Sequence, residues 1–258
     1  MLRRRAATYD AYMGEVSAKR EESISGGGAF PPTAWTLVQQ AAAPDGELRD
    51  PALNELAERY WRPIYAYLRY SGRSPVDAED LTQSFFIHLL EKDLLARVRL
   101  RQVRFRGFLR SVLENFLANA ARTNGAKKRQ PSFAFDIHEV EHRLAACGES
   151  TPEAAFDNLW AVERLESAVA TLRSELRQAG REWVVDALLD RVGFEAASVG
   201  ELSRRHGVTE NQLSVALHRA RQRLRELLQG EAARTTTSAE EAADELAAMF
   251  TALGHRAT

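Results

Sequence analysis

The sequence has little of what secreted, membrane or disulfide-bonded proteins require. Cys147 is the single cysteine among 258 residues, so no disulfide can form within the chain, which fits a reducing compartment. No apolar run is long enough to span a membrane, and no apolar segment follows the basic residues Arg3–Arg5 as it would in a secretory signal. These absences predict a cytoplasmic protein with no membrane partner.

Segments with the alternating pattern of strands are also missing, and so are internal repeats. Apolar residues instead recur at helical spacing, which predicts an all-α chain. We expect two helical domains, over residues 33–130 and 152–230, joined by a linker over residues 131–151. A disordered polar tail over residues 1–32 precedes them, and an extension over residues 231–258 with a short acidic helix follows.

The net charge is only −1, but the charges are segregated along the chain. Residues 97–129 carry ten Lys or Arg and one acid, and residues 202–225 carry six Arg and one acid. Residues 35–95 carry ten acids and six bases. This segregation predicts two basic surfaces for phosphates and one acidic surface for another partner.

Residues 198–228 predict two helices joined by a tight turn. Capping boxes begin at Ser198 and at Thr209, and Gly207 between them can take the left-handed conformation that ends a helix. The second helix has an apolar stripe of Leu213, Leu217, Ala220 and Leu224. Its opposite face carries Asn211, Val215, His218, Arg219 and Gln222. The pattern predicts a helix-turn-helix that reads a major groove, and the alternative is a helical hairpin with a solvated face.

A third feature is the helix predicted over residues 108–121, which lies in a basic and aromatic segment. Spacings of four, four and three positions give it one polar stripe, made of Ser111, Asn115, Asn119 and Arg122. Basic groups for phosphates, with aromatics and amides for unstacked bases, are what single-strand binding needs. The alternatives are that the stripe is only a solvated face and that Phe108 belongs to the core.

At three places the sequence resembles bacterial RNA polymerase sigma factors of the extracytoplasmic-function (ECF) subfamily. Residues 60–93 are similar to the segment that binds core polymerase, and residues 105–129 to the segment that melts and reads the minus-ten promoter element. Residues 200–228 are similar to the helix-turn-helix that reads the minus-thirty-five element. The resemblance implies a sigma region 2-like helical bundle, then a sigma region 4-like helix-turn-helix domain. It also implies promoter recognition and DNA opening with no enzymatic activity and no cofactor.

The resemblance further implies three sets of contact residues. Those for core polymerase lie at an acidic helix start, at Asp77, Glu79, Asp80, Gln83 and Phe86. Those for the minus-ten element are Arg104, Phe105, Arg106, Phe108, Arg110, Ser111, Asn115, Asn119, Arg122, Lys127, Lys128 and Arg129. Those for the minus-thirty-five element are Thr209, Asn211, Gln212, Ser214, Val215, His218, Arg219, Arg221 and Arg223. Core RNA polymerase and promoter DNA are thus the expected partners. The resemblance also allows an anti-sigma factor or another regulatory protein as a further partner.

The recognition helix departs from the family at two positions. Many members carry a lysine and an arginine in its first turns, where this chain has Ser214 and Ala216. We therefore expect Arg219, Arg221 and Arg223 to supply more of the phosphate contacts.

Two other functions are compatible with parts of the sequence. Residues 138–142 read HEVEH, which matches the H-E-x-x-H of zinc peptidases. Their charged surroundings in the predicted linker favour chance occurrence, so we expect no metal site. A stand-alone helix-turn-helix regulator is the other alternative, but it would leave the helix over residues 77–91 unexplained.

The last predicted helix, over residues 239–253, combines acids with an apolar face. The acids are Glu240, Glu241, Asp244 and Glu245, and the apolar face consists of Leu246, Met249, Phe250 and Leu253. Simple packing on the second domain is one interpretation. The other is regulatory, with the acids competing with DNA for a basic surface or the apolar face docking a partner.

Overall fold

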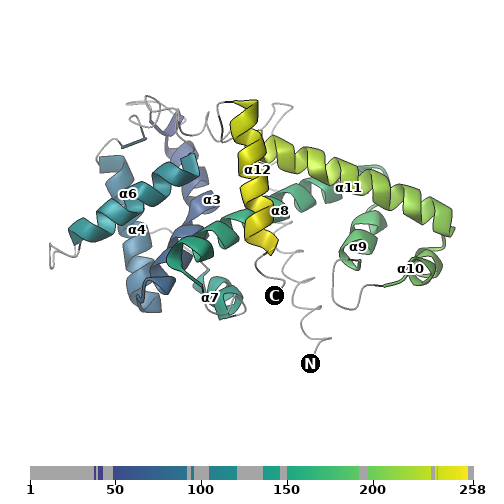
Figure 1. Cartoon of the computed structure of the whole chain (residues 1–258), viewed down its shortest axis with the longest axis horizontal. Coiled ribbons are helices and arrows are strands. Elements are labelled where there is room, and N and C mark those ends of the chain that lie inside the picture. Colours follow the sequence, from purple (N-terminus) through teal and green to yellow (C-terminus); the bar gives the residue numbers. More distant parts are fainter. Residues whose placement is uncertain are drawn as a thin grey trace. The chain divides into compact units, whose positions relative to one another are not determined.

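The computed structural model describes residues 38, 40–42, 49–91, 94, 95, 105–120, 136–145, 150–191, 197–233, 236 and 238–254. The regular elements in these ranges are all helices, which confirms the all-α prediction (Figure 1). They are α3 (Arg49–Tyr70), α4 (Pro75–Glu91), α6 (Phe105–Ala120), α7 (Ile137–Ala145), α8 (Pro152–Gln178), α9 (Trp183–Leu189), α10 (Val199–His206), α11 (Glu210–Ala233) and α12 (Ala239–Gly254). None of them is long and apolar enough to cross a membrane. The predicted tail over residues 1–32 lies outside the described residues.

The helix α8 contacts helices that precede it and helices that follow it in the sequence. It begins at Thr151, whose hydroxyl accepts the N–H of Ala154 at 3.2 Å, and Pro152 opens its first turn, where a missing N–H costs nothing. Its buried side packs against α3 on one side and against α9, α11 and α12 on the other. The helix that opens the predicted second domain therefore also packs on α3 of the predicted first domain.

One hydrophobic cluster occupies the centre of these contacts. Tyr60 of α3 and Phe105 of α6 meet edge to face with their ring centroids 5.2 Å apart, and Trp160 of α8 is fully buried nearby in the same cluster. Large aromatic rings bury much apolar area each, so they contribute strongly to this core. Leu228 of α11 and Met249 of α12 belong to the cluster as well, which ties the last two helices to α3 and α6.

The short helix α7 lies inside the predicted linker, where the sequence analysis named no helix. Its few apolar residues include Val140 and Leu144, which are buried. Charged groups supply the rest of its attachment, because Arg62 of α3 forms ion pairs with Glu139 of α7 at 3.3 Å and with Glu163 of α8 at 3.0 Å. The apolar residues of this segment are too few to give a clear helical pattern, so the sequence analysis did not predict a helix that long-range ion pairs hold in place.

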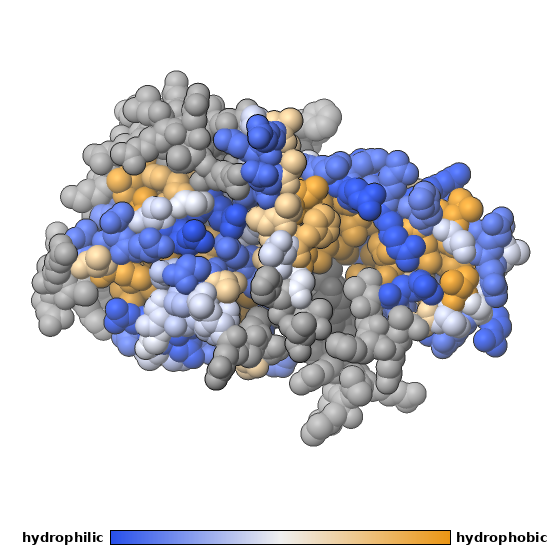
Figure 2. Space-filling model, viewed as in Figure 1, coloured by the Kyte–Doolittle hydropathy of each residue, from blue (hydrophilic) through white to orange (hydrophobic). Residues whose placement is uncertain are grey.

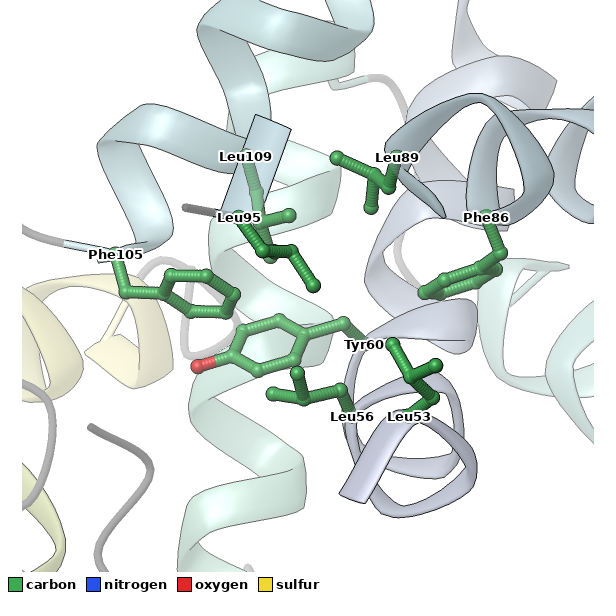
Figure 3. Close-up of a pocket in the computed structure, with 8 residues that line it drawn as sticks. All are labelled: Leu53, Leu56, Tyr60, Phe86, Leu89, Leu95, Phe105 and Leu109. Carbon is green, nitrogen blue, oxygen red and sulfur yellow. The ribbon is translucent and has the colours of Figure 1, made fainter. Parts of the chain in front are cut away.

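A small apolar pocket lies inside the cluster, between α3, α4 and α6. Figure 3 shows its lining side chains, which are Leu53, Leu56, Tyr60, Phe86, Leu89, Leu95, Phe105 and Leu109. The Tyr60 hydroxyl is the one polar side-chain group among these eight, so the pocket offers a ligand almost nothing to bind by hydrogen bonds. We interpret it as part of the core.

Candidate nucleic-acid and polymerase interfaces

The helix-turn-helix has the local geometry that its capping residues predict. Ser198 accepts the N–H of Glu201 at 3.2 Å at the start of α10, and Gly207 ends α10 with a φ of 65° and a ψ of 30°. This left-handed conformation suits glycine because it has no side chain to clash. Thr209 and Gln212 then form a reciprocal box, in which Gln212 accepts the Thr209 N–H at 2.9 Å and Thr209 accepts the Gln212 N–H at 3.2 Å. The reciprocal box at Thr209 and the glycine turn are confirmed, and at Ser198 the cap hydrogen bond of the predicted box is present.

The helix α11 separates an apolar face from a polar one. Its stripe is confirmed, since Leu213, Leu217 and Ala220 are buried and Leu224 is partly buried. Every residue of the set predicted for the minus-thirty-five element is exposed, namely Thr209, Asn211, Gln212, Ser214, Val215, His218, Arg219, Arg221 and Arg223. Figure 2 shows hydrophilic residues along this helix. The exposed face can therefore be presented to a groove as a unit.

The arginines on that face are not equivalent. Arg223 donates to both oxygens of Glu175 in α8, at 2.9 and 2.7 Å, and it also contacts Glu226 at 3.0 Å. The hydrogen bonds from Arg223 lower the pKa of Glu175, against the effect of burial. Arg219 and Arg221 form no ion pair with any residue in the described ranges. Of the three arginines predicted to contact phosphates, these two are therefore more available than Arg223.

The acidic start of α4 presents its carboxylates to solvent. Ser74 accepts the Asp77 N–H at 3.1 Å and so caps the helix, and its hydroxyl donates to the Asp77 carboxylate at 2.7 Å. Asp77 and Asp80 are exposed, and Glu79 is half-buried. A cap that stays exposed can still bind a partner, so capping and docking are compatible.

Two other members of the predicted polymerase set and one omitted residue complete this region. Gln83 is half-buried, whereas Phe86 is 6% exposed and packs edge to face on Phe85 at 5.9 Å. Phe86 therefore supports the helix from the core instead of lying on its surface. Val76, which the sequence analysis did not single out, is 68% exposed beside the acids. Its position in the first turn, outside the apolar stripe, was the available signal.

The polar stripe of α6 lies on the surface, as its spacing predicts. Ser111, Asn115 and Asn119 are all exposed. The Asn115 amide donates to the Ser111 carbonyl at 2.8 Å, which leaves the amide oxygen and a second N–H for another partner. The predicted residues Arg104, Arg122, Lys127, Lys128 and Arg129 lie outside the described residues.

The two aromatic residues predicted beside this stripe differ in exposure. Phe105 is 1% exposed and belongs to the core, while Phe108 is half-buried. Their rings stack with centroids 6.2 Å apart. Phe108 is therefore the ring of this pair that retains surface for stacking on a base.

The two arginines of α6 contact α8, and Arg106 also contacts α12. Arg106 is bound to Asp157 of α8 at 2.5 Å and to Glu245 of α12 at 3.1 Å, and its guanidinium lies over the Trp160 ring at 4.6 Å. Burial lowers the pKa of Arg106, but the hydrogen bonds and charges of the two carboxylates outweigh it and leave the pKa raised. Arg110 lies 3.7 Å from Asp157 and is more exposed. In this conformation Arg106 is thus occupied within the chain, which the sequence analysis did not foresee.

The HEVEH segment forms most of α7 and has a structural role. His138 and His142 are exposed, whereas Glu141 accepts hydrogen bonds from Arg69 at 2.5 and 3.1 Å and from the Tyr65 hydroxyl at 2.6 Å. These bonds, chiefly those from Arg69, lower the pKa of Glu141. No three His, Cys, Asp or Glu side chains converge as a metal site in the described part of the chain, and Cys147 lies outside it.

Comparison with known proteins gives a match to the part of the chain that carries α4 and α6. Residues 56–127, which include α4 and α6, match the family model for Sigma-70 region 2. No curated protein and no solved structure gives a significant match. The match supports a sigma-70 family member that acts in transcription initiation, in a family whose region 2 binds core RNA polymerase and promoter DNA.

Proposed function

We propose that this chain is an alternative sigma factor of the ECF type, which binds core RNA polymerase and directs promoter recognition and DNA opening. The observation that carries the proposal is the combination of two parts in one chain. A region 2 match over residues 56–127 is followed by a capped helix-turn-helix whose outer face is polar and basic. A sigma factor needs both parts, because it must hold the polymerase and read two separated promoter elements.

The polymerase contact is assigned to the start of α4. Asp77 and Asp80 provide exposed carboxylates, and Val76 adds an exposed apolar side chain beside them. Charged groups around an apolar contact are the usual composition of a protein interface. Gln83 and Glu79 extend this surface along the helix. Phe86 holds the helix in place by packing in the core.

The minus-ten contact is assigned to the outer face of α6. Ser111, Asn115 and Asn119 offer hydrogen-bonding groups for bases, and the half-buried Phe108 offers an aromatic edge. Arg110 lies on the same helix and can reach a phosphate. Such a mixture of amides, an aromatic ring and a cation suits unstacked single-stranded bases better than it suits an intact duplex.

The minus-thirty-five contact is assigned to the exposed face of α11. Arg219 and Arg221 are placed to neutralise phosphates, while Asn211, Gln212 and Ser214 in the first turns are placed to meet base edges. In this proposal the protein works in the bacterial cytoplasm, uses no cofactor and leaves nucleotide addition to the polymerase.

Co-elution with purified bacterial core RNA polymerase tests this proposal against the stand-alone regulator. We expect the chain to elute with core enzyme in size-exclusion chromatography and to let the complex bind a promoter duplex more tightly than either component alone. A stand-alone regulator would bind DNA without joining core enzyme. Elution apart from core enzyme at low and physiological salt would contradict the sigma-factor proposal.

A further inference from the structure

The buried face of α12 is built around an acid and not around its largest apolar residue. Glu245 is 1% exposed, and Met249, four residues later on the same face, is also 1% exposed. Phe250, which the sequence analysis placed on the apolar face, is instead 51% exposed. The helix is therefore turned so that a carboxylate faces the interior, and this orientation needs a positive partner because an unpaired buried carboxylate is very costly.

That partner is Arg106, at the start of α6. The Arg106 Nε lies 3.1 Å from one oxygen of Glu245 and its Nη2 lies 3.2 Å from the other, which is a two-point contact. Asp157 of α8 holds the remaining nitrogen at 2.5 Å. The Arg106 side chain is 14% exposed, so these two carboxylates and the Trp160 ring leave little of it accessible.

The rest of α12 places further negative charge at the same location. Its sequence contains four acids, Glu240, Glu241, Asp244 and Glu245, and no Lys or Arg. The helix is fixed there by contacts with α8 and α11, including a hydrogen bond of 2.9 Å from the Asn158 amide to the Ala252 carbonyl. Among these acids, Glu245 contacts α6 directly, through Arg106.

We propose that α12 is an intramolecular inhibitor of nucleic-acid binding, in which Glu245 occupies the Arg106 guanidinium that would otherwise bind a phosphate of single-stranded DNA. The inference rests on the proposed function of α6 as the minus-ten helix. It adds a regulatory contact between that helix and the C-terminal extension, which adjoins the predicted helix-turn-helix domain.

The energetics of the contact suit a reversible switch. The attraction between two buried charges is largely offset by the cost of removing both from water, so the pair contributes little net stability. Opening returns both groups to solvent and recovers that cost. A DNA phosphate that displaces Glu245 from Arg106 therefore has little net pair stability to overcome, besides the packing of Met249 on the same face of α12.

The test is single-strand binding by the full-length chain, using a short fluorescein-labelled oligonucleotide of mixed sequence in an anisotropy titration. Glu245→Gln keeps the shape of the side chain and removes its charge. We expect it to bind the probe at least about threefold more tightly at low salt. Its plot of log affinity against log salt should steepen by about 0.7, the value for one added phosphate contact on a single strand. Glu240→Gln, which neutralises an exposed acid of the same helix, is the matched control and should change little.

A double-mutant cycle assigns the gain to Arg106. In the Arg106→Gln background, Glu245→Gln should no longer tighten binding. A gain that persists without Arg106, or an equal gain from Glu240→Gln, would overturn the proposed contact. Thermal unfolding verifies that each variant is folded. If Glu245→Gln is unstable, Glu245→Asp keeps the charge but shortens the side chain by one methylene, which weakens its two-point contact with Arg106. It should tighten binding by a smaller factor, whereas unchanged binding would overturn the proposal.

These outcomes are separate from those that test the sigma-factor proposal, because the oligonucleotide assay contains no polymerase. A wild-type chain that does not join core enzyme contradicts the proposed function. A Glu245→Gln variant that joins core enzyme normally but gains no affinity for the probe contradicts only the inhibitory role of α12.

Discussion

Arg223 of α11 and Glu175 of α8 form a two-point ion pair, with N–O distances of 2.9 and 2.7 Å. The two residues are 45% and 40% exposed at their side chains, so the pair is worth at most about 1 kcal/mol. Its effect is geometric, because it directs the guanidinium toward α8. Arg223 thus differs from Arg219, although both are exposed arginines of the same helix.

The first prediction compares these two arginines. Arg219→Ala should lower the affinity for a promoter duplex and flatten its salt dependence by a slope of about 0.9, the value for one lost phosphate contact. Arg223→Ala should change the slope by much less, because its charge is already paired. Anisotropy titrations over a salt series measure both slopes. Equal slopes for the two variants would contradict the distinction.

The second prediction concerns core polymerase. Glu79→Arg combined with Asp80→Arg should weaken binding to core enzyme at least tenfold, since it reverses two charges at the start of α4. Circular dichroism should show an unchanged helical content. Glu240→Arg, a charge reversal at an exposed site on α12, is the control and should bind core enzyme as the wild type does. Wild-type affinity in the double variant would contradict the assignment of α4 to the interface with core enzyme.

The third prediction concerns the stripe on α6. Asn115→Ala and Asn119→Ala should each reduce promoter opening or minus-ten specificity, while duplex binding through α11 stays nearly unchanged. Permanganate reactivity of unpaired thymines measures opening, and a gel-shift titration of the closed duplex measures binding. Normal opening together with unchanged base preference in both variants would show that the stripe is only a solvated face and does not contact DNA.

The parts of this structure that the sequence predicts are those set by neighbouring residues. Several local features are of this kind: the cap at Ser198, the box at Thr209, the left-handed Gly207 and the stripe through Leu213. Each depends on residues only a few positions apart. Capping and helical periodicity are local rules, so a single sequence carries them. The bounds of α12 follow from the same rules.

The parts that the sequence does not predict depend on contacts between distant residues. Nothing near Arg106 indicates that Glu245, 139 positions later, faces it. This pairing sets the orientation of α12, so that Glu245 is buried and Phe250, although apolar, is exposed. The burial of Phe86 could not be predicted either, because periodicity alone does not show which of two adjacent phenylalanines in a helix lies in the core.

The fourth prediction concerns the attachment of α7. Because Arg69 lowers the pKa of Glu141 in the folded state, the stabilisation is present above the ordinary glutamate pKa of about 4.3 and is lost as the pH falls through the lowered value. Glu141→Gln should therefore lower the free energy of unfolding by roughly 1 kcal/mol at neutral pH and by less in acid. Urea unfolding across this pH range measures the difference, with Glu240→Gln as the control. A difference that grows toward acid would contradict the assigned cause.

Run-off transcription tests whether the chain directs initiation as a sigma factor. Purified bacterial core polymerase is combined with the full-length chain on genomic fragments, and the start sites of the transcripts are mapped. We expect initiation at a small set of sites that share two elements upstream of the start. The variant with both Glu79→Arg and Asp80→Arg should lose this initiation, whereas Glu240→Arg should initiate at the same sites as the wild type. Core polymerase that forms a complex with the chain but starts no transcript at any specific site would contradict the account.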